Sequence, residues 1–364
     1  MENRETSERL KNDAKTIARI VLRTGLQVGT ILGAKAAYDS FFKRYEKRDI
    51  NTIFGEFDYS RVKTRLPRTA FFFPSNNLKL QGYFYPCYNA KGMVVVCHGM
   101  RAGADDYIPF IEFFVQNGYA VFTYDCQGTY TSEGNSTVGM CTPLVNLDHA
   151  LTYIKNDQQL SRYPLFLFGH SWGGYAATSV LSIHKNICGC SAVAPFNSGY
   201  TLFVEKGEQY TSPFSDMLKN DFPKEFLDAY QTLLFKDYTK YDAVQGINST
   251  DIPVYIAHGN RDSVISFSHQ SVISHRDEIR KNNVTYYIGT DAQAGHNTIL
   301  HSPRAVAYQD KVKNDLKQLK REYNRELTQE EMTEFCNSVD HALYSEVNTE
   351  MMQEILNIFN KAIK

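Results

Sequence analysis

The segment 169–174, with the sequence Gly-His-Ser-Trp-Gly-Gly, restricts the fold of this chain more than any other. It follows the apolar run 165–168, which predicts a buried strand, and it precedes a run that is typical of a helix. A turn this tight brings the strand and helix backbones close together, and glycine is the residue type that tolerates such an approach. We therefore predict that Gly169 and Gly173 are structural. The same turn holds the Ser171 hydroxyl at the positive end of a helix.

A serine hydroxyl becomes a nucleophile only with a base beside it and an acid that orients the base. Two later runs, 252–259 and 283–288, predict further buried strands, and each ends in a loop. Asp262 lies in the loop after the first run, and His296 lies in the loop after the second. The carboxyl ends of parallel strands meet at one edge of a sheet, where sites of this kind form. The order Ser171, Asp262, His296 therefore predicts a catalytic triad.

Other residues compete for the same roles. Asp262 could be an ordinary turn residue, in which case Asp291 is the alternative acid, and His301 is the alternative base. We interpret His98 and His258 as structural, since each comes directly after a strand and before a glycine. His170 lies inside the tight turn, where we expect it to pack or bond locally.

Stabilising a tetrahedral oxyanion requires two backbone N–H donors. We assign the first to Trp172, the residue after the serine. The second should come from the loop that follows an earlier strand, and the run 93–97 predicts such a strand. We assign this donor to Met100, and we expect Gly99 to let the chain turn there without a side chain that blocks the substrate.

Taken together, these motifs resemble the α/β-hydrolase superfamily, specifically the branch of monoacylglycerol lipases, lysophospholipase-like esterases and serine aminopeptidases. Tyr130 occupies a position where that family usually has a second glycine, so we expect a stiffer or bulkier loop there. The resemblance covers about residues 66–300 and the last helix. It implies a mostly parallel central sheet with helices on both faces, a helical cap and a hydrolytic triad. The matching segments are 95–99, 124–134, 169–174, 258–262 and 295–296.

Strands alternate with helices after residue 93, which predicts an α/β architecture, and 69–85 predicts an antiparallel pair at the sheet edge. The alternation stops at an aromatic-rich stretch, where we expect at least half of the rings to form the cap's own core and the others to line a substrate cavity. Asn348 or Thr349 is expected to cap the last helix. The predicted divisions are an N-terminal helical extension (1–50), the core (51–196 and 251–301), the cap (197–250), an insertion of two surface helices (302–346) and the last core helix (347–364).

The N-terminal extension predicts one long helix over 16–48. Its longest uncharged stretch, 24–34, is shorter than the roughly 20 residues that a spanning helix needs. Three interpretations stay open: docking on the body of the protein, peripheral contact with a membrane through 16–42, and self-association. Small residues recur at every fourth position, as in closely packed helices: Gly25, Gly29, Gly33 and Ala37.

The net charge, the cysteines and the motifs that are missing limit the classes of function that this chain can have. The net charge of −1 gives no general attraction to nucleic acid. The seven cysteines are an odd, scattered set, and Cys188 and Cys190 are expected to share one face of a strand. We interpret this pattern as typical of a cytoplasmic protein, in a reducing compartment, with buried thiols. No zinc-type spacing, phosphate loop or dinucleotide motif occurs, so we predict neither a metal nor a cofactor.

The leading substrate hypothesis is a small-molecule carboxylic ester with an apolar acyl chain, such as a lysolipid or a monoacylglycerol. A serine aminopeptidase with the same triad is the first alternative, and it needs an acidic pair in the cap, for which Glu205, Glu208 and Asp216 are available. A non-catalytic binding protein that retains the fold is the second alternative. The oligomeric state stays open.

Overall fold

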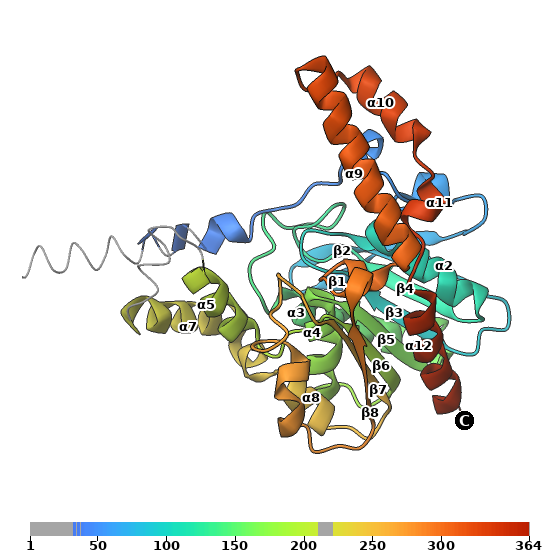
Figure 1. The fold of residues 1–364 in the computed structure, drawn as a ribbon. Coiled ribbons are helices and arrows are strands. Elements are labelled where there is room, and N and C mark those ends of the chain that lie inside the picture. Colours follow the sequence, from blue (N-terminus) through green and yellow to red (C-terminus); the bar gives the residue numbers. More distant parts are fainter. Residues whose placement is uncertain (1–31, 34, 37, 210–220, 364) are drawn as a thin grey trace, which may run out of the picture.

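Eight strands form a single sheet within the described part of the chain, which comprises residues 32–363 except 34, 37 and 210–220 in this computed structural model (Figure 1). Their order across the sheet is β1-β2-β4-β3-β5-β6-β7-β8. β2 pairs antiparallel with β1 and β4, and all other neighbours are parallel. The strands are β1 (Thr69–Ser75), β2 (Leu78–Tyr85), β3 (Met93–Cys97), β4 (Ala120–Tyr124), β5 (Leu165–His170), β6 (Ile187–Val193), β7 (Val254–Gly259) and β8 (Val284–Gly289).

Helices cover both faces of the sheet, as the alternating pattern predicts. β3, β4, β5 and β7 are buried at every position, because each of these strands lies between two packed layers. One hydrophobic core lies between the sheet and helices α3, α4 and α8, and a second lies between the sheet and α2 and α12. These helices are α2 (Ile108–Gln116), α3 (Thr142–Asn156), α4 (Trp172–Ser179), α8 (Ala243–Asn248) and α12 (Thr349–Ala362).

The segment after β6 leaves the sheet and forms α5 (Gly199–Gln209) and α7 (Asp221–Phe235) before α8 returns to it (Figure 1). A Cβ added to Gly246 of α8 would lie 2.0 Å from the carbonyl oxygen of Thr178. α8 therefore packs directly on α4, and the last helix of the predicted cap range lies against the core.

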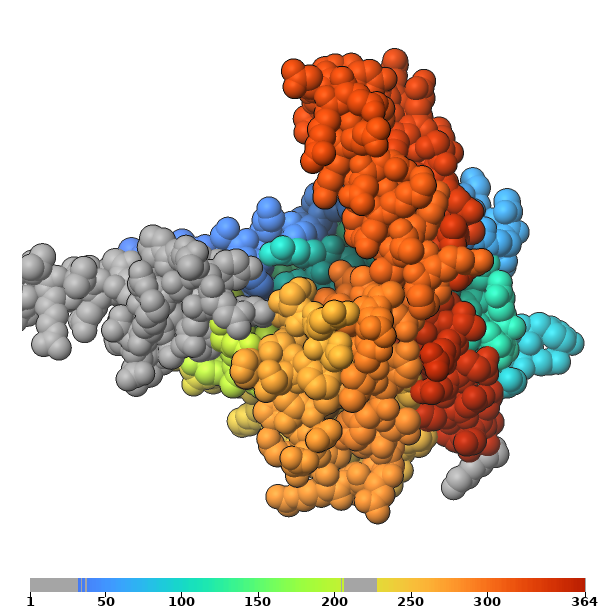
Figure 2. All heavy atoms as spheres, viewed as in Figure 1, coloured from blue at the N-terminus to red at the C-terminus, as the bar shows by residue number. Residues whose placement is uncertain are grey.

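A second excursion follows β8. α9 (Pro303–Tyr323) and α10 (Gln329–Ser338) project beyond the sheet as a pair, and α11 (His341–Tyr344) leads back to it (Figures 1 and 2). The two predicted surface helices are thus present, with one short helix in addition. Asn348 caps α12, because its side chain accepts a hydrogen bond from the Met351 N–H at 3.2 Å.

Short 3-10 helices connect many of these elements. Among the described residues they are η1 (Ile50–Thr52), η2 (Tyr59–Arg61), η3 (Ala104–Tyr107), η4 (Leu160–Arg162), η5 (Val180–Ser182), η6 (Lys236–Lys240), η7 (Val272–Glu278), η8 (Asp291–Gln293) and η9 (Thr298–Leu300).

Two predictions are wrong. The helix expected over 16–48 lies mostly outside the described residues, but its described part ends at 41, and the chain beyond runs extended along the core. There Tyr45 forms a bridge with Thr129, and the Arg44 side chain donates to backbone carbonyls of the same loop, so tertiary hydrogen bonds replace the helical ones. Cys188 and Cys190 face opposite cores, because a bulge where β6 meets β5 reverses the alternation between them.

Candidate active site

The tight turn after β5 has the geometry that its glycines predict. Ser171 has a φ of 54°, in the left-handed region that non-glycine residues seldom occupy. A Cβ on Gly169 would lie 2.2 Å from the Gly173 carbonyl oxygen, and a Cβ on Gly173 would lie 2.1 Å from the Cys97 carbonyl oxygen. Only glycine fits at either position. The turn therefore fixes the Ser171 side chain at the start of α4.

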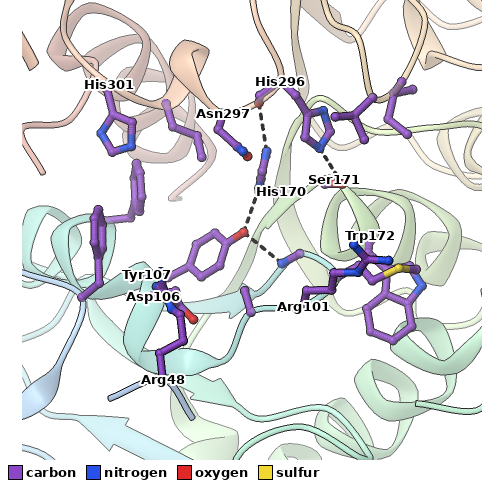
Figure 3. A pocket seen from close by; sticks show the side chains of 18 of the residues that line it. Arg48, Arg101, Asp106, Tyr107, His170, Ser171, Trp172, His296, Asn297 and His301 are labelled. Atoms are coloured by element: carbon purple, nitrogen blue, oxygen red, sulfur yellow. Dashed lines mark hydrogen bonds and ion pairs between the residues drawn. The ribbon is translucent and has the colours of Figure 1, made fainter. Parts of the chain in front are cut away.

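The structure brings together the three side chains that the sequence places in order. His296 Nε2 lies 2.9 Å from Ser171 Oγ, and His296 Nδ1 lies 2.7 Å from Asp262 Oδ2 (Figure 3). All three come from loops at the carboxyl ends of parallel strands. The serine hydroxyl can donate to the imidazole while the imidazole donates to the carboxylate, which is the arrangement that activates a serine.

Asp262 is held as an anion by its surroundings. Burial alone would raise the pKa of its carboxyl, but hydrogen bonds from His258 and His296 lower that pKa well below its usual value. The backbone N–H groups of Val264 and Ile265 also donate to Oδ1, at 2.7 and 2.8 Å. His258 Nε2 lies 3.2 Å from Oδ2, so the predicted structural histidine touches the acid directly.

Neither alternative side chain occupies the triad. Asp291 lies in the exposed helix η8, where its backbone carbonyl accepts from the Arg261 side chain. The buried ring of His301 has its Nδ1 3.3 Å from the Glu346 carbonyl oxygen. His98 is buried as expected, and its Nε2 accepts from the Cys126 N–H at 2.9 Å.

Met100 and Trp172, the residues proposed as oxyanion donors, both line the cavity that contains Ser171. Trp172 is the first residue of α4, where backbone N–H groups have no helical partner. Gly99 N–H donates to the Tyr107 hydroxyl at 2.9 Å, whereas the Met100 N–H has no acceptor among the described residues. A Cβ on Gly99 would lie 3.1 Å from the same hydroxyl. The Tyr107 hydroxyl therefore occupies part of the room that Gly99 leaves, and Gly99 itself lines the cavity.

A chain of hydrogen bonds, which sequence inspection misses, connects the base loop to the loop after β3. The Tyr107 hydroxyl donates to His170 Nδ1 at 2.7 Å, and His170 Nε2 lies 3.2 Å from the His296 carbonyl oxygen (Figure 3). Burial lowers the pKa of His170 to about 3, so its ring is neutral and can accept at one nitrogen while it donates at the other. Tyr107 and His170 thus position both sides of the site.

Replacing Tyr107 with phenylalanine is expected to lower kcat for ester hydrolysis by about 10- to 100-fold, since an unsatisfied buried polar group costs about 1–3 kcal/mol. The change removes the acceptor for Gly99 N–H and the donor to His170. Steady-state kinetics on p-nitrophenyl butyrate would measure it. The control is Tyr119→Phe, whose hydroxyl bonds Asn360 at 3.1 Å and does not line the cavity. Equal kcat values for Tyr107→Phe and wild type would contradict a positioning role.

His301 gives the protein a defined pH dependence of stability. Burial lowers its pKa to about 4, below the value of about 6.5 in an unfolded chain. Between these values the unfolded state binds the extra proton, so the free energy of unfolding falls as pH drops from about 6.5 to about 4. His301→Asn should reduce this loss by on the order of 3 kcal/mol. Urea denaturation at several pH values would test it, with the exposed His269→Asn as control. A pH slope unchanged by His301→Asn is the contrary result.

A cavity of about 710 Å³ opens onto Ser171 and His296. Its walls come from distant parts of the chain: the N-terminal segment 41–57, the loop after β3, the start of α5 and the end of the C-terminal insertion. Phe54 joins two of these parts, because its ring lies 5.7 Å from that of Phe335 and 5.9 Å from that of Tyr344. Apolar side chains dominate the lining, among them Phe54, Phe57, Phe110, Leu202, Phe203 and Leu300.

The sequence predicts that aromatic rings of the cap line the cavity, but several of the lining rings come from other segments. Of the aromatics predicted in the cap, Phe203 lines the cavity, while Phe235 packs against Cys141 and Val145. Sequence inspection missed the contribution of 41–57, and it missed three charged residues in the lining, Arg48, Arg101 and Asp106. The run of aromatics and cations around residue 45 was the available signal, but a helical interpretation hid it.

Some expectations fall on parts that the structure describes only partly. Asp216 and the Glu208 side chain lie outside the described residues, and Glu205 does not line the cavity. Gly25 and Gly29 likewise lie outside them. Within the described ranges, no helix is both long and apolar enough to cross a membrane. The same ranges hold no group of three or more histidine, cysteine or acidic side chains placed to bind a metal ion.

Comparison with known proteins finds relatives over part of the chain. The family model "Serine aminopeptidase, S33" matches residues 88–213. The lysophosphatidylserine lipase ABHD12 of Danio rerio is 26% identical over 183 residues, which is 48% of this chain and 44% of the relative. The polyketide transferase grgF of a Penicillium species is 24% identical over 134 residues, or 36% of this chain and 46% of the relative. The chain therefore spans about half the length of these curated relatives.

Solved structures resemble the fold more extensively. The esterase Pf2001 of Pyrococcus furiosus superimposes with a TM-score of 0.52 at 19% identity, covering 76% of this chain and 98% of that one. Est1E of Butyrivibrio proteoclasticus gives a TM-score of 0.50 at 12% identity, covering 81% and 98%. At such identities the likeness concerns the arrangement of the sheet and its helices.

Proposed function

We propose that this chain, which its motifs, family match and fold assign to the α/β-hydrolases, cleaves carboxylic esters through an acyl-enzyme on Ser171. The observation that carries the proposal is the continuous path from Asp262 through His296 to Ser171, with contacts of 2.7 and 2.9 Å. A buried anion, an oriented imidazole and a strained serine are the parts that nucleophilic acyl transfer requires.

Acylation is the first half of the proposed reaction. His296 Nε2 takes the proton of Ser171 as Oγ attacks the ester carbonyl. The backbone N–H groups of Trp172 and Met100 stabilise the negative oxygen of the tetrahedral intermediate. His296 then gives the proton to the departing alcohol, and the acyl group stays on Ser171.

Deacylation repeats these steps with water. His296 Nε2 removes a proton from a water molecule as that water attacks the acyl carbonyl. The second tetrahedral intermediate collapses, the carboxylic acid leaves, and Ser171 recovers its proton from His296. Asp262 stays ionised throughout, and it stabilises the imidazolium that forms in each half.

The proposed substrate is an ester of the lysolipid or monoacylglycerol type. The apolar lining of the cavity supports this class, because an acyl chain gains about 25 cal/mol for each Å² of apolar surface removed from water. The lysophosphatidylserine lipase and the esterase among the similar proteins support it as well. In this proposal 51–196 and 251–301 form the core, and 197–250 and 302–346 are insertions that shape the cavity.

The serine aminopeptidase alternative rests on the family model that matches residues 88–213. Such an enzyme must hold a free ammonium group, for which an acidic pair near Ser171 would be needed. Asp106, whose carboxylate pairs with Arg48, is the one acidic side chain among the described lining residues. The ester hypothesis is therefore preferred to the peptidase one.

Two assays test the proposal together. An activated fluorophosphonate should label the protein at Ser171, as located by peptide mass spectrometry. Hydrolysis of p-nitrophenyl esters of increasing chain length should peak at medium or long acyl chains. Turnover of aminoacyl p-nitroanilides in place of esters would favour the aminopeptidase. Absence of both labelling and turnover would favour a non-catalytic binding protein.

A further inference from the structure

The cavity holds two arginines beside the candidate triad, and only one of them has a carboxylate partner among the described residues. Arg48 Nη2 lies 2.5 Å from Asp106 Oδ1, so these two charges compensate each other. Asp106 is fixed in turn, because its Oδ2 accepts from the Gly103 N–H at 2.8 Å and from the Tyr130 hydroxyl at 2.5 Å. The Arg48–Asp106 pair therefore forms a neutral, rigid part of the lining.

Arg101 is the uncompensated cation. Its Nε donates to the Tyr45 hydroxyl at 3.0 Å, and its guanidinium lies 5.6 Å from the centre of the Phe41 ring. Among the described residues no carboxylate lies within ion-pair distance of it, and its two Nη groups donate to no protein acceptor. Its side chain is thus anchored at Nε while the other edge of the guanidinium stays available.

Arg101 lines the same cavity as Ser171 and His296. It directly follows Met100, the proposed oxyanion donor, and Figure 3 shows its side chain between Trp172 and the Arg48–Asp106 pair. The backbone of Arg101 has a φ of 65°, in the region that favours glycine. A left-handed backbone, a hydrogen bond and an aromatic contact together hold a planar cation at the rim of the oxyanion site.

We propose that Arg101 binds an acidic group, a phosphate or a carboxylate, on the alcohol portion of the ester, which makes the preferred substrate an anionic acyl ester. A guanidinium offers two parallel N–H donors that match the oxygens of either group. Apolar residues such as Phe57, Leu202 and Phe203 then face the acyl chain. This inference rests on the proposed ester hydrolysis and adds the charge of the substrate to it.

The test compares lauroyl esters that differ in the charge of the alcohol portion. The set is lauroyl lysophosphatidic acid, lauroyl glycolate, lauroyl lysophosphatidylcholine and monolauroylglycerol, assayed for kcat/KM with wild type and Arg101→Gln. Wild type should prefer the two anionic esters. The kcat/KM of Arg101→Gln should fall about 10- to 100-fold on these two esters, mostly through KM. On monolauroylglycerol it should change less than about threefold. The two anionic esters separate phosphate from carboxylate recognition.

Controls and a second readout keep the outcomes distinct. The exposed Arg162→Gln, which removes a cation outside the cavity, should change none of the rates. Octyl phosphate should raise the Tm of wild type and of Ser171→Ala but not that of Arg101→Gln, while 1-octanol should not discriminate among them. That binding result is independent of turnover, so it tests Arg101 even where the proposed hydrolysis fails.

Three results would overturn the proposal. Equal losses on anionic and neutral esters would mean that Arg101 only supports the loop through Tyr45. A wild-type preference for monolauroylglycerol over both anionic esters would exclude an acidic substrate. An octyl phosphate shift of equal size in wild type and Arg101→Gln would place the anion elsewhere.

Discussion

Ser171→Ala is expected to lower kcat for p-nitrophenyl ester hydrolysis by about 10⁵- to 10⁶-fold, because the residue that forms the acyl-enzyme is lost. In wild type the Ser171 hydroxyl lies 2.9 Å from His296 Nε2. In the variant this hydroxyl is missing, so the imidazole has no serine proton to take. The fold should be unchanged, and so should the cavity and the oxyanion donors, since alanine retains the Cβ of the serine. Single-turnover and steady-state rates on the same ester would measure the loss.

A nearby serine provides the control for this variant. Ser263 directly follows Asp262, but it is exposed and takes no part in the triad's hydrogen bonds, so Ser263→Ala should retain wild-type kcat. Circular dichroism of both variants should match that of wild type. If Ser171→Ala kept more than about a hundredth of the wild-type rate, another nucleophile would be responsible and the acyl-enzyme mechanism would be wrong.

Asp262→Asn is expected to lower kcat by about 10⁴-fold while it leaves the cavity intact. The neutral amide cannot stabilise the imidazolium, and its NH₂ can face His296 Nδ1 and force the wrong tautomer. Two imidazoles lose their shared anion at once, since His258 Nε2 also contacts Oδ2, at 3.2 Å. The pH dependence of kcat should change together with its magnitude.

Asp291→Asn separates this effect from a general loss of negative charge. Asp291 lies near His296 in sequence but is exposed and does not contact it. We expect wild-type kcat for that variant. A large loss in Asp291→Asn with little loss in Asp262→Asn would exchange the two roles and would contradict the geometry of the site.

The positions of the three triad candidates are predictable from sequence because each depends on a local signal. A buried apolar run marks a strand, and a parallel sheet delivers the residue after each strand to the same edge. Ser171, Asp262 and His296 all follow such runs. The requirement for glycine at 169 is local too, since its Cβ would meet the Gly173 carbonyl oxygen, whereas the requirement at 173 comes from the distant Cys97 carbonyl oxygen.

What could not be predicted depends on contacts between distant segments. Tyr107 and His170 are 63 residues apart, and no periodicity connects them. The bulge that separates Cys188 from Cys190 depends on how β6 pairs with β5. The helix expected over 16–48 has good local propensity up to its end, yet backbone pairing of Tyr45 with a loop more than 80 residues away replaces its last turns, after residue 41.

The ring contacts of Phe54 determine when one wall of the cavity can form during synthesis of the chain. When His296 has been added to the nascent chain, every residue of the proposed triad is present, but Phe335 and Tyr344, which pack on Phe54, are still to be translated. One wall of the cavity must wait for them, because its first and last pieces are almost 300 residues apart. The pocket that would select a substrate can therefore close only after the C-terminal insertion has been synthesised.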